Sequence, residues 1–289
     1  MPALPEGAVD AHVHLWQRAR TPQDWIDPVS MRAIDRDFWF DDLDTVLVDN
    51  GMSGCVVVQS ANSGGETDDL LNAELPSSVA IVGWIDLESE SVRDGLDELL
   101  GTPNGSQLAG LRHLAHTDPD PHWMSGSAVS KGFDALERAG LSFDFVVTQL
   151  QLADCAWVAG EHPELVFVLD HLGKPDLRHG DRFLWEQSLR ALASHPNVYA
   201  KLSGLTVQAD WGAWRPDDLR SSVAAVLDCF GPERLMFGSD WPLVELCGGY
   251  SAWNSAAHEL LSELNAIEQD DVFGLTARRA YRIAVEPRA

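Results

Sequence analysis

The chain has 289 residues, of which 45% are hydrophobic and 22% charged, and its formal net charge is −25. The apolar fraction is typical of a folded protein and excludes a largely disordered one, while the negative charge disfavours nucleic acid and anionic membrane surfaces as partners. No run approaches the roughly 18 apolar residues of a membrane helix, and the first residues do not have the pattern of a signal peptide.

Eight short apolar runs rich in β-branched residues alternate with amphipathic segments along the chain. The predicted strands are residues 8–16, 54–60, 79–87, 108–114, 143–147, 165–171, 197–204 and 234–241. Helices are predicted between and after them at residues 41–51, 91–101, 129–140, 152–162, 182–195, 216–230 and 251–264. Most of the strands are apolar at successive positions, as in strands that are covered on both faces.

This alternation predicts an α/β protein, a (β/α)8 TIM barrel, in preference to an open doubly wound sheet. No linker, internal repeat or change of composition divides the chain, so we expect a single domain over residues 1–289. Two irregular segments, residues 17–40 and 115–127, follow predicted strand ends. Barrel enzymes build their active-site walls at these ends, although loops without a role are equally compatible with the pattern.

The four cysteines are far apart and form no CxxC pair; they are Cys55, Cys155, Cys229 and Cys247. The spacing predicts neither a zinc knuckle nor a disulfide framework but reduced thiols. A cytoplasmic protein fits this use of cysteine best.

The first predicted strand carries two histidines. His12 and His14 are two residues apart, so in a regular strand their side chains, and that of Asp10, point to the same side. Two imidazoles that converge in this way suit catalysis or a metal ion. Taken alone, the pattern is equally compatible with structural histidines.

Two further strands end in residues that can take part in catalysis. Asp170 and His171 end the sixth strand, and Asp240 follows the eighth. Separately, His171 fits a turn and Asp240 fits a helix or turn cap. Together with His12 and His14 they stand at the ends of strands one, six and eight, on the face where barrel enzymes carry their active site. The combination favours an active site.

At these residues the sequence resembles the amidohydrolase superfamily, which opens with an HxH motif on strand one and closes with an Asp after strand eight. The segments DAHVHLW, AGLRH, FVLDHLGKP, VYAKLSG and FGSDWP resemble the branch of sugar-lactone and pyrone-dicarboxylate lactonases, which includes fuconolactonase-like and rhamnonolactonase-like enzymes. The similarity runs from about residue 8 to about residue 284 and therefore covers nearly the whole chain.

The resemblance implies that the protein is a hydrolase of carbohydrate metabolism that opens a ring ester. In that role Asp240 is the general base that activates water, and His12, His14 and His171 polarise the carbonyl. Arg112 adds donors for the substrate, although a structural ion pair explains it nearly as well. The expected substrate-binding residues, which include tryptophans suited to a sugar ring, are Arg112, His113, Trp84 and Trp241.

The resemblance does not decide the metal. Metal-dependent members usually carry a bridging Lys or Glu on strand four and a His on strand five, whereas this chain has GLRH and FDFVVTQ there, so a two-metal site is not expected. His12, His14, His171 and Asp240 suit one Zn(II) ion, and catalysis without a metal is the open alternative.

The leading hypothesis is a lactonase for an aldonic or aldaric acid lactone, and a homo-oligomer is compatible with the sequence. One alternative is a metal-dependent decarboxylase of the same superfamily. Another is a catalytically silent barrel that binds a sugar or a partner protein. The identity of the sugar cannot be derived from the sequence.

Overall fold

Eight short parallel strands form one sheet whose order follows the sequence. The computed structural model describes residues 7–177 and 182–283. The strands are β1 (Val9–Val13), β2 (Gly54–Val58), β3 (Val79–Gly83), β4 (Leu108–His113), β5 (Ser142–Phe145), β6 (Phe167–Leu169), β7 (Val198–Leu202) and β8 (Leu235–Phe237). Each lies within or next to a predicted strand, and most end earlier than predicted. The apolar runs continue past the strand ends because the following loops are also packed against the core.

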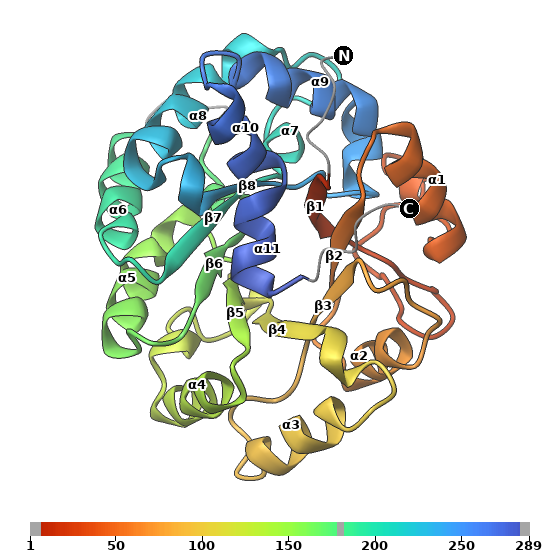
Figure 1. Ribbon diagram of the computed structural model, residues 1–289, viewed down its shortest axis with the longest axis vertical. Helices are drawn as coiled ribbons and strands as arrows, with labels where there is room; N and C mark the ends of the chain where they lie inside the picture. Colours follow the sequence, from red (N-terminus) through yellow and green to blue (C-terminus); the bar gives the residue numbers. More distant parts are fainter. Residues whose placement is uncertain (1–6, 178–181, 284–289) are drawn as a thin grey trace.

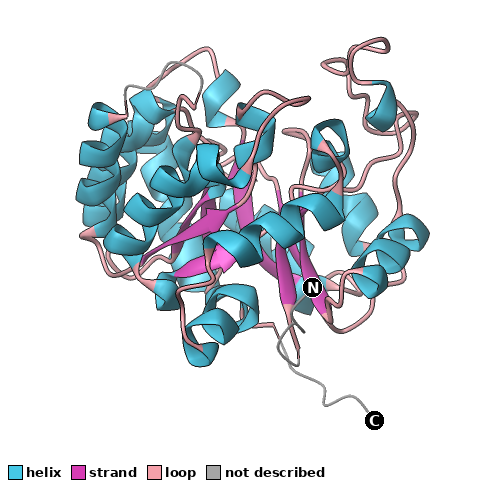
Figure 2. Cartoon of the chain, turned by 90° about the horizontal axis from the view of Figure 1, so that it is seen from above, coloured by secondary structure: helices cyan, strands magenta, loops and turns pink. Residues whose placement is uncertain are grey.

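The helices surround the strands (Figure 1). They are α1 (Phe40–Asp49), α2 (Gly64–Leu71), α3 (Val92–Leu100), α4 (Ser127–Ala139), α5 (Leu152–Glu161), α6 (Phe183–Ala193), α7 (Leu205–Gln208), α8 (Pro216–Phe230), α9 (Tyr250–Leu260), α10 (Ala266–Asp270) and α11 (Thr276–Tyr281). All seven predicted helices are present. The single-domain (β/α)8 barrel is therefore confirmed, with the strands inside and the helices outside (Figure 2).

The barrel closes where β1 meets the loop after β8. Val13 and Trp241 form a parallel bridge. The amide of Asp240 donates to the carbonyl of His12 at 2.9 Å, and the amide of His14 donates to the carbonyl of Trp241 at 2.7 Å. The backbone bonds that close the barrel thus also bring the first and last site segments together.

The two ends of the barrel differ. Helix α11 lies across one end (Figure 1), where Ala277, Ala280 and Tyr281 pack on Val9 and other small apolar side chains that face the barrel interior. Because these contacts lie near the starts of the strands, the carboxyl ends remain as the open end.

Two other expectations concern the chain as a whole. All four cysteines are free in the structure, as predicted. Among the helices of the described ranges, none combines the length and the apolar character needed to cross a membrane.

Candidate active site

A register shift in β1 decides which side chains enter the barrel. The shift lies between Asp10 and Val13, where β1 pairs with β2. The ring of His12 contacts Arg112 of β4 and Lys201 of β7 inside the barrel, whereas the carboxylate of Asp10 accepts hydrogen bonds from the Tyr250 hydroxyl of α9 at 2.8 Å and from the Ser239 amide at 2.9 Å. The prediction that Asp10 shares a side with the histidines is therefore wrong, because an irregularity in a strand exchanges its two faces.

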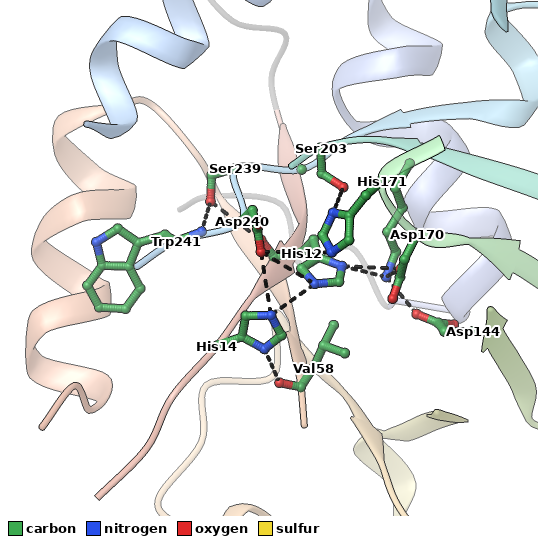
Figure 3. Close-up of polar contacts among 12 residues, drawn as sticks. His12, His14, Val58, Asp144, Asp170, His171, Ser203, Ser239, Asp240 and Trp241 are labelled. Atoms are coloured by element: carbon green, nitrogen blue, oxygen red, sulfur yellow. Dashed lines mark hydrogen bonds and ion pairs between the residues drawn. The ribbon is translucent and has the colours of Figure 1, made fainter. Parts of the chain in front are cut away.

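Three imidazoles converge on one carboxylate (Figure 3). Oδ1 of Asp240 lies 3.8 Å from Nε2 of His12, 3.5 Å from Nε2 of His14 and 4.0 Å from Nε2 of His171. The two nitrogens Nε2 of His12 and His14 are 3.1 Å apart. All four residues are buried, and Oδ1 of Asp240 has no hydrogen-bond partner. The sequence-predicted quartet is thus brought together at one point.

The other ring nitrogen of each histidine is bound by the protein. Nδ1 of His14 lies 2.8 Å from the carbonyl oxygen of Val58, and Nδ1 of His171 lies 2.9 Å from Oγ of Ser203. Because a carbonyl oxygen only accepts, Nδ1 of His14 carries the proton, and a neutral His14 presents a lone pair at Nε2. That lone pair suits a ligand for a cation better than a hydrogen-bond donor.

Burial shapes the protonation of the site. It lowers the pKa of His171 to about 4 and that of His12 well below its usual value, so both rings are neutral near pH 7. Burial alone would raise the pKa of Asp240, but the neighbouring His171, His14 and His12 outweigh it and hold this pKa below the usual range. The site therefore contains the neutral rings of His12 and His171 beside an ionised carboxylate.

These donors fit a single zinc ion. One ligand atom each from His12, His171 and Asp240 lies within 4.8 Å of the others. Neighbouring ligands of a tetrahedral zinc ion lie about 3.3 Å apart when the Zn–N distance is about 2.0–2.1 Å. The side chain of His14, 3.1 Å from His12 and 3.5 Å from Asp240, completes the set. The bonds at the Nδ1 atoms orient the rings, as is usual for metal-binding histidines.

A left-handed turn delivers His171. The residues His171, Leu172, Gly173 and Lys174 have φ values of 52°, 54°, 70° and 53°. Each left-handed residue other than glycine costs about 1–2 kcal/mol. The turn is held by the indole of Trp185, which donates to the Leu172 carbonyl at 2.8 Å, and by the complete burial of Leu172.

A glycine makes room for this histidine. Gly204 has φ +65°, and a Cβ atom there would lie 2.4 Å from Nδ1 of His171. Any side chain at this position would displace the ring or the backbone after β7. The glycine of VYAKLSG is thus explained by the site.

A buried ionic network lies beneath His12. Nζ of Lys201 is 2.6 Å from Oδ2 of Asp144, 3.0 Å from Oδ1 of Asp170 and 3.2 Å from Nδ1 of His12. The guanidinium of Arg112 donates to Asp170 at 2.8 Å. Two buried cations and two buried carboxylates thus compensate one another and hold the ring of His12 from below.

One further bond ties this network to the closed end of the barrel. The hydroxyl of Tyr281 in α11 donates to Oδ2 of Asp144 at 2.7 Å. The last helix therefore contributes to the support of the site, although it lies at the other end of the strands.

A cavity of about 420 Å³ opens beside the histidines. It is lined by His14, Trp16, Trp25, Ser60, Arg112, Leu114, His116, Thr117, Val146, His171, Lys174, Asp240 and Leu243. Arg112 thus both lines the cavity and forms the ion pair with Asp170. The irregular segments 17–40 and 115–127 contribute Trp25, His116 and Thr117, as expected of loops after strand ends.

Three predicted substrate-binding residues are absent from this lining. The indole of Trp84 donates to Nδ1 of His113 at 3.2 Å, and His113 stacks on Trp123 with ring centroids 3.8 Å apart. Trp241 packs edge to face on Phe38, with centroids 5.1 Å apart. Trp84 and His113 thus bind each other and Trp241 packs on Phe38, outside the lining of this cavity.

Two titratable residues of the cavity, Lys174 and His116, were not expected from the sequence. Lys174 lies in the segment FVLDHLGKP, three residues after His171, and His116 lies in the loop after β4. Neither had a signal of its own, because their directions depend on the left-handed turn and on the loop path.

A (β/α)8 barrel with an HxH motif at β1 and an aspartate after β8 defines an amidohydrolase-type barrel enzyme. A family model described as amidohydrolase matches residues 9–283. The chain belongs to this family.

Two relatives match almost the whole chain. An L-fucono-1,5-lactonase of Burkholderia ambifaria is 35% identical over 283 residues, which cover 95% of each chain. The crystal structure of an amidohydrolase from Burkholderia multivorans with bound Zn is 33% identical, has a TM-score of 0.88, and is matched over 96% of this chain and 100% of its own.

A more distant structure shares the fold alone. A dihydroxybenzoic acid decarboxylase from Polaromonas with bound manganese is 11% identical, with a TM-score of 0.64 and coverage of 96% and 97% of the two chains.

Replacing Gly204 tests the close approach to His171. We expect Gly204→Ala to destabilise the protein by about 1–3 kcal/mol, because the new Cβ meets the ring at a backbone position with positive φ. The matched control is Gly212→Ala, whose Cβ has no neighbour within 4 Å. Urea unfolding of both variants is the measurement, and equal midpoints would contradict the assignment.

Replacing Lys201 tests the network. Lys201→Met leaves the buried carboxylate of Asp144 without a cation and that of Asp170 with Arg112 alone, and it should destabilise the fold by about 3–5 kcal/mol. Lys131→Met, at an exposed position of α4, should stay within about 0.5 kcal/mol of the unchanged protein. The free energy of unfolding in urea measures both. A small loss at Lys201 would show that the carboxylates do not depend on this lysine.

Proposed function

We propose that this protein is a lactonase that hydrolyses the ring ester of a sugar-acid lactone. The observation that carries the proposal is the convergence of three buried imidazoles on the carboxylate of Asp240, beside a cavity of about 420 Å³. That volume accommodates one small, polar ring. The 35% identity with an L-fucono-1,5-lactonase over 95% of both chains supports a sugar lactone as substrate.

The reaction needs one base and one electrophilic centre. A water oxygen attacks the carbonyl carbon, the ring C–O bond breaks, and the product is an open hydroxy acid. The proton that water loses goes first to the base and then to the ring oxygen as it leaves. Asp240 is the base in this proposal, because its carboxylate is ionised, has an unpaired Oδ1 and lines the cavity.

His12, His14 and His171 form the electrophilic side. Their Nε2 atoms would hold a zinc ion, and when bound the ion would polarise the ester carbonyl and favour ionisation of water. Lys201 and Asp170 keep His12 in place from below. Arg112, already paired with Asp170, reaches the same cavity and adds positive charge near the developing oxyanion.

A decarboxylase and a silent binding barrel are the competing functions. The decarboxylase from Polaromonas is 11% identical to this chain, so its similarity shows a common fold and does not support a common activity. A silent binder does not require an ionised carboxylate among three imidazoles. The geometry therefore favours hydrolysis.

The kind of substrate, the cellular location and the excluded partners are proposed from the composition of the sequence. We propose a small-molecule substrate and a cytoplasmic location, without nucleic acid or a membrane surface as partner. The acidic composition and the four separate free cysteines support these expectations.

Replacing Asp240 tests the base. Asp240→Asn is nearly isosteric and should lower kcat for an aldonolactone by at least about 10³-fold while the protein stays folded. Proton release at constant pH follows the reaction. The control is Asp97→Asn, at an exposed position of α3, which should retain full activity. Comparable turnover by the two variants would remove Asp240 from the mechanism.

Removal of zinc tests the metal. We expect about one zinc ion per chain by elemental analysis, and loss of lactonase activity on chelation with recovery on adding zinc. His14→Ala should weaken zinc retention in a competition titration with a chromophoric chelator. Full activity of a zinc-free sample would instead assign the histidines to catalysis without a metal.

A further inference from the structure

The cavity has two walls of different chemistry. Trp16 and Trp25 come from the segment after β1, whereas His116 and Lys174 follow β4 and β6. In a ring of eight strands in sequence order, β1 lies opposite β5, and β4 and β6 flank β5. An aromatic wall therefore faces a polar wall across the cavity.

The aromatic wall offers ring surface, mostly from Trp25, which is 45% exposed and packs on the buried Trp16, and neither indole has a free N–H to donate. The indole N–H of Trp16 donates to the carbonyl of Arg36 at 2.8 Å, and that of Trp25 donates to Oε1 of Gln23 at 2.7 Å. The two rings stand edge to face, with centroids 6.2 Å apart. Such a wall suits the C–H face of a sugar ring.

The polar wall carries groups without partners. Within residues 7–177 and 182–283, neither the ammonium of Lys174 nor Nδ1 of His116 forms a hydrogen bond or ion pair, and Nδ1 of His116 is fully buried. The chain has three lysines: Lys131 is exposed and Lys201 is bound in the network under His12. Lys174 is the lysine that lines the cavity.

The left-handed turn links this wall to the reaction centre. His171 and Lys174 are its first and last residues, and the backbone amide of Lys174 donates to the His171 carbonyl at 2.9 Å. Residues three apart in so tight a turn project to the same side. One rigid segment therefore delivers a histidine to the carboxylate of Asp240 and an ammonium to the cavity.

We propose that Lys174, with His116 beside it, binds the hydroxyl-bearing edge of the lactone and makes the site selective for hydroxylated rings. The inference rests on the proposed lactonase function. An ammonium donates up to three hydrogen bonds, and a neutral imidazole donates one and accepts one. Neighbouring hydroxyls of a sugar ring both donate and accept, so they match this pair, while their C–H face meets Trp16 and Trp25.

The test compares two ring esters that differ in their hydroxyls. The substrates are an aldono-1,5-lactone and δ-valerolactone, the same six-membered ring without hydroxyls. Lys174→Met should lower kcat/KM for the aldonolactone about 10- to 100-fold, chiefly through KM, and should change that for δ-valerolactone less than about threefold. Lys174→Arg, which keeps the charge, should recover part of the loss.

Lys131→Met is the matched control, since it removes the same charge at an exposed position, and it should change neither substrate. Equal losses on both substrates, or no loss on either, would overturn the role of Lys174. If the unchanged protein hydrolyses both lactones and prefers δ-valerolactone, the proposed lactonase function holds and the inference about Lys174 fails. If it opens neither ring, the proposed function itself fails.

Discussion

The site depends on one electrostatic constraint. Nε2 of His14 presents a lone pair 3.1 Å from another imidazole nitrogen and 3.5 Å from a carboxylate oxygen, and all three side chains are largely buried. Such an arrangement is repulsive unless a proton or a cation lies among these atoms. The hydrogen bond from His14 to Val58 prevents the ring from relieving the repulsion by exchanging tautomers. A proton on Nε2 of His12 removes this repulsion, and a bound zinc ion would remove it at the same atoms.

The surrounding structure holds these groups against their own repulsion. The buried pairs of Lys201 and Arg112 with Asp144 and Asp170 immobilise His12, and the left-handed turn immobilises His171. Both devices cost free energy, because charges are removed from water and residues adopt an unfavourable backbone. Their presence at the open end of the barrel is typical of a site where function outweighs local stability.

Charge is distributed unevenly between the surface and the cavity. The chain carries 45 acidic residues against 20 basic ones, yet the cavity is lined by Arg112, Lys174 and three histidines beside the single carboxylate of Asp240. The acidic net charge of the chain therefore does not indicate the charge of the cavity. The net charge informs on solubility and on the class of partner, whereas recognition depends on a few oriented donors.

The sequence by itself determined the strand and helix alternation, the barrel, and the segments that carry His12, His14, His171 and Asp240. These follow from local hydrophobic patterns and from the rule that barrel sites lie at the strand ends. The directions of side chains were decided only by the tertiary structure. The irregularity in β1 turned Asp10 away from the histidines, and the left-handed turn aimed Lys174 into the cavity. Trp84 and His113 bind each other although they are 29 residues apart in the sequence, and His113 also stacks on Trp123. Strand register and positive φ angles arise from long-range pairing and packing, which local patterns do not encode.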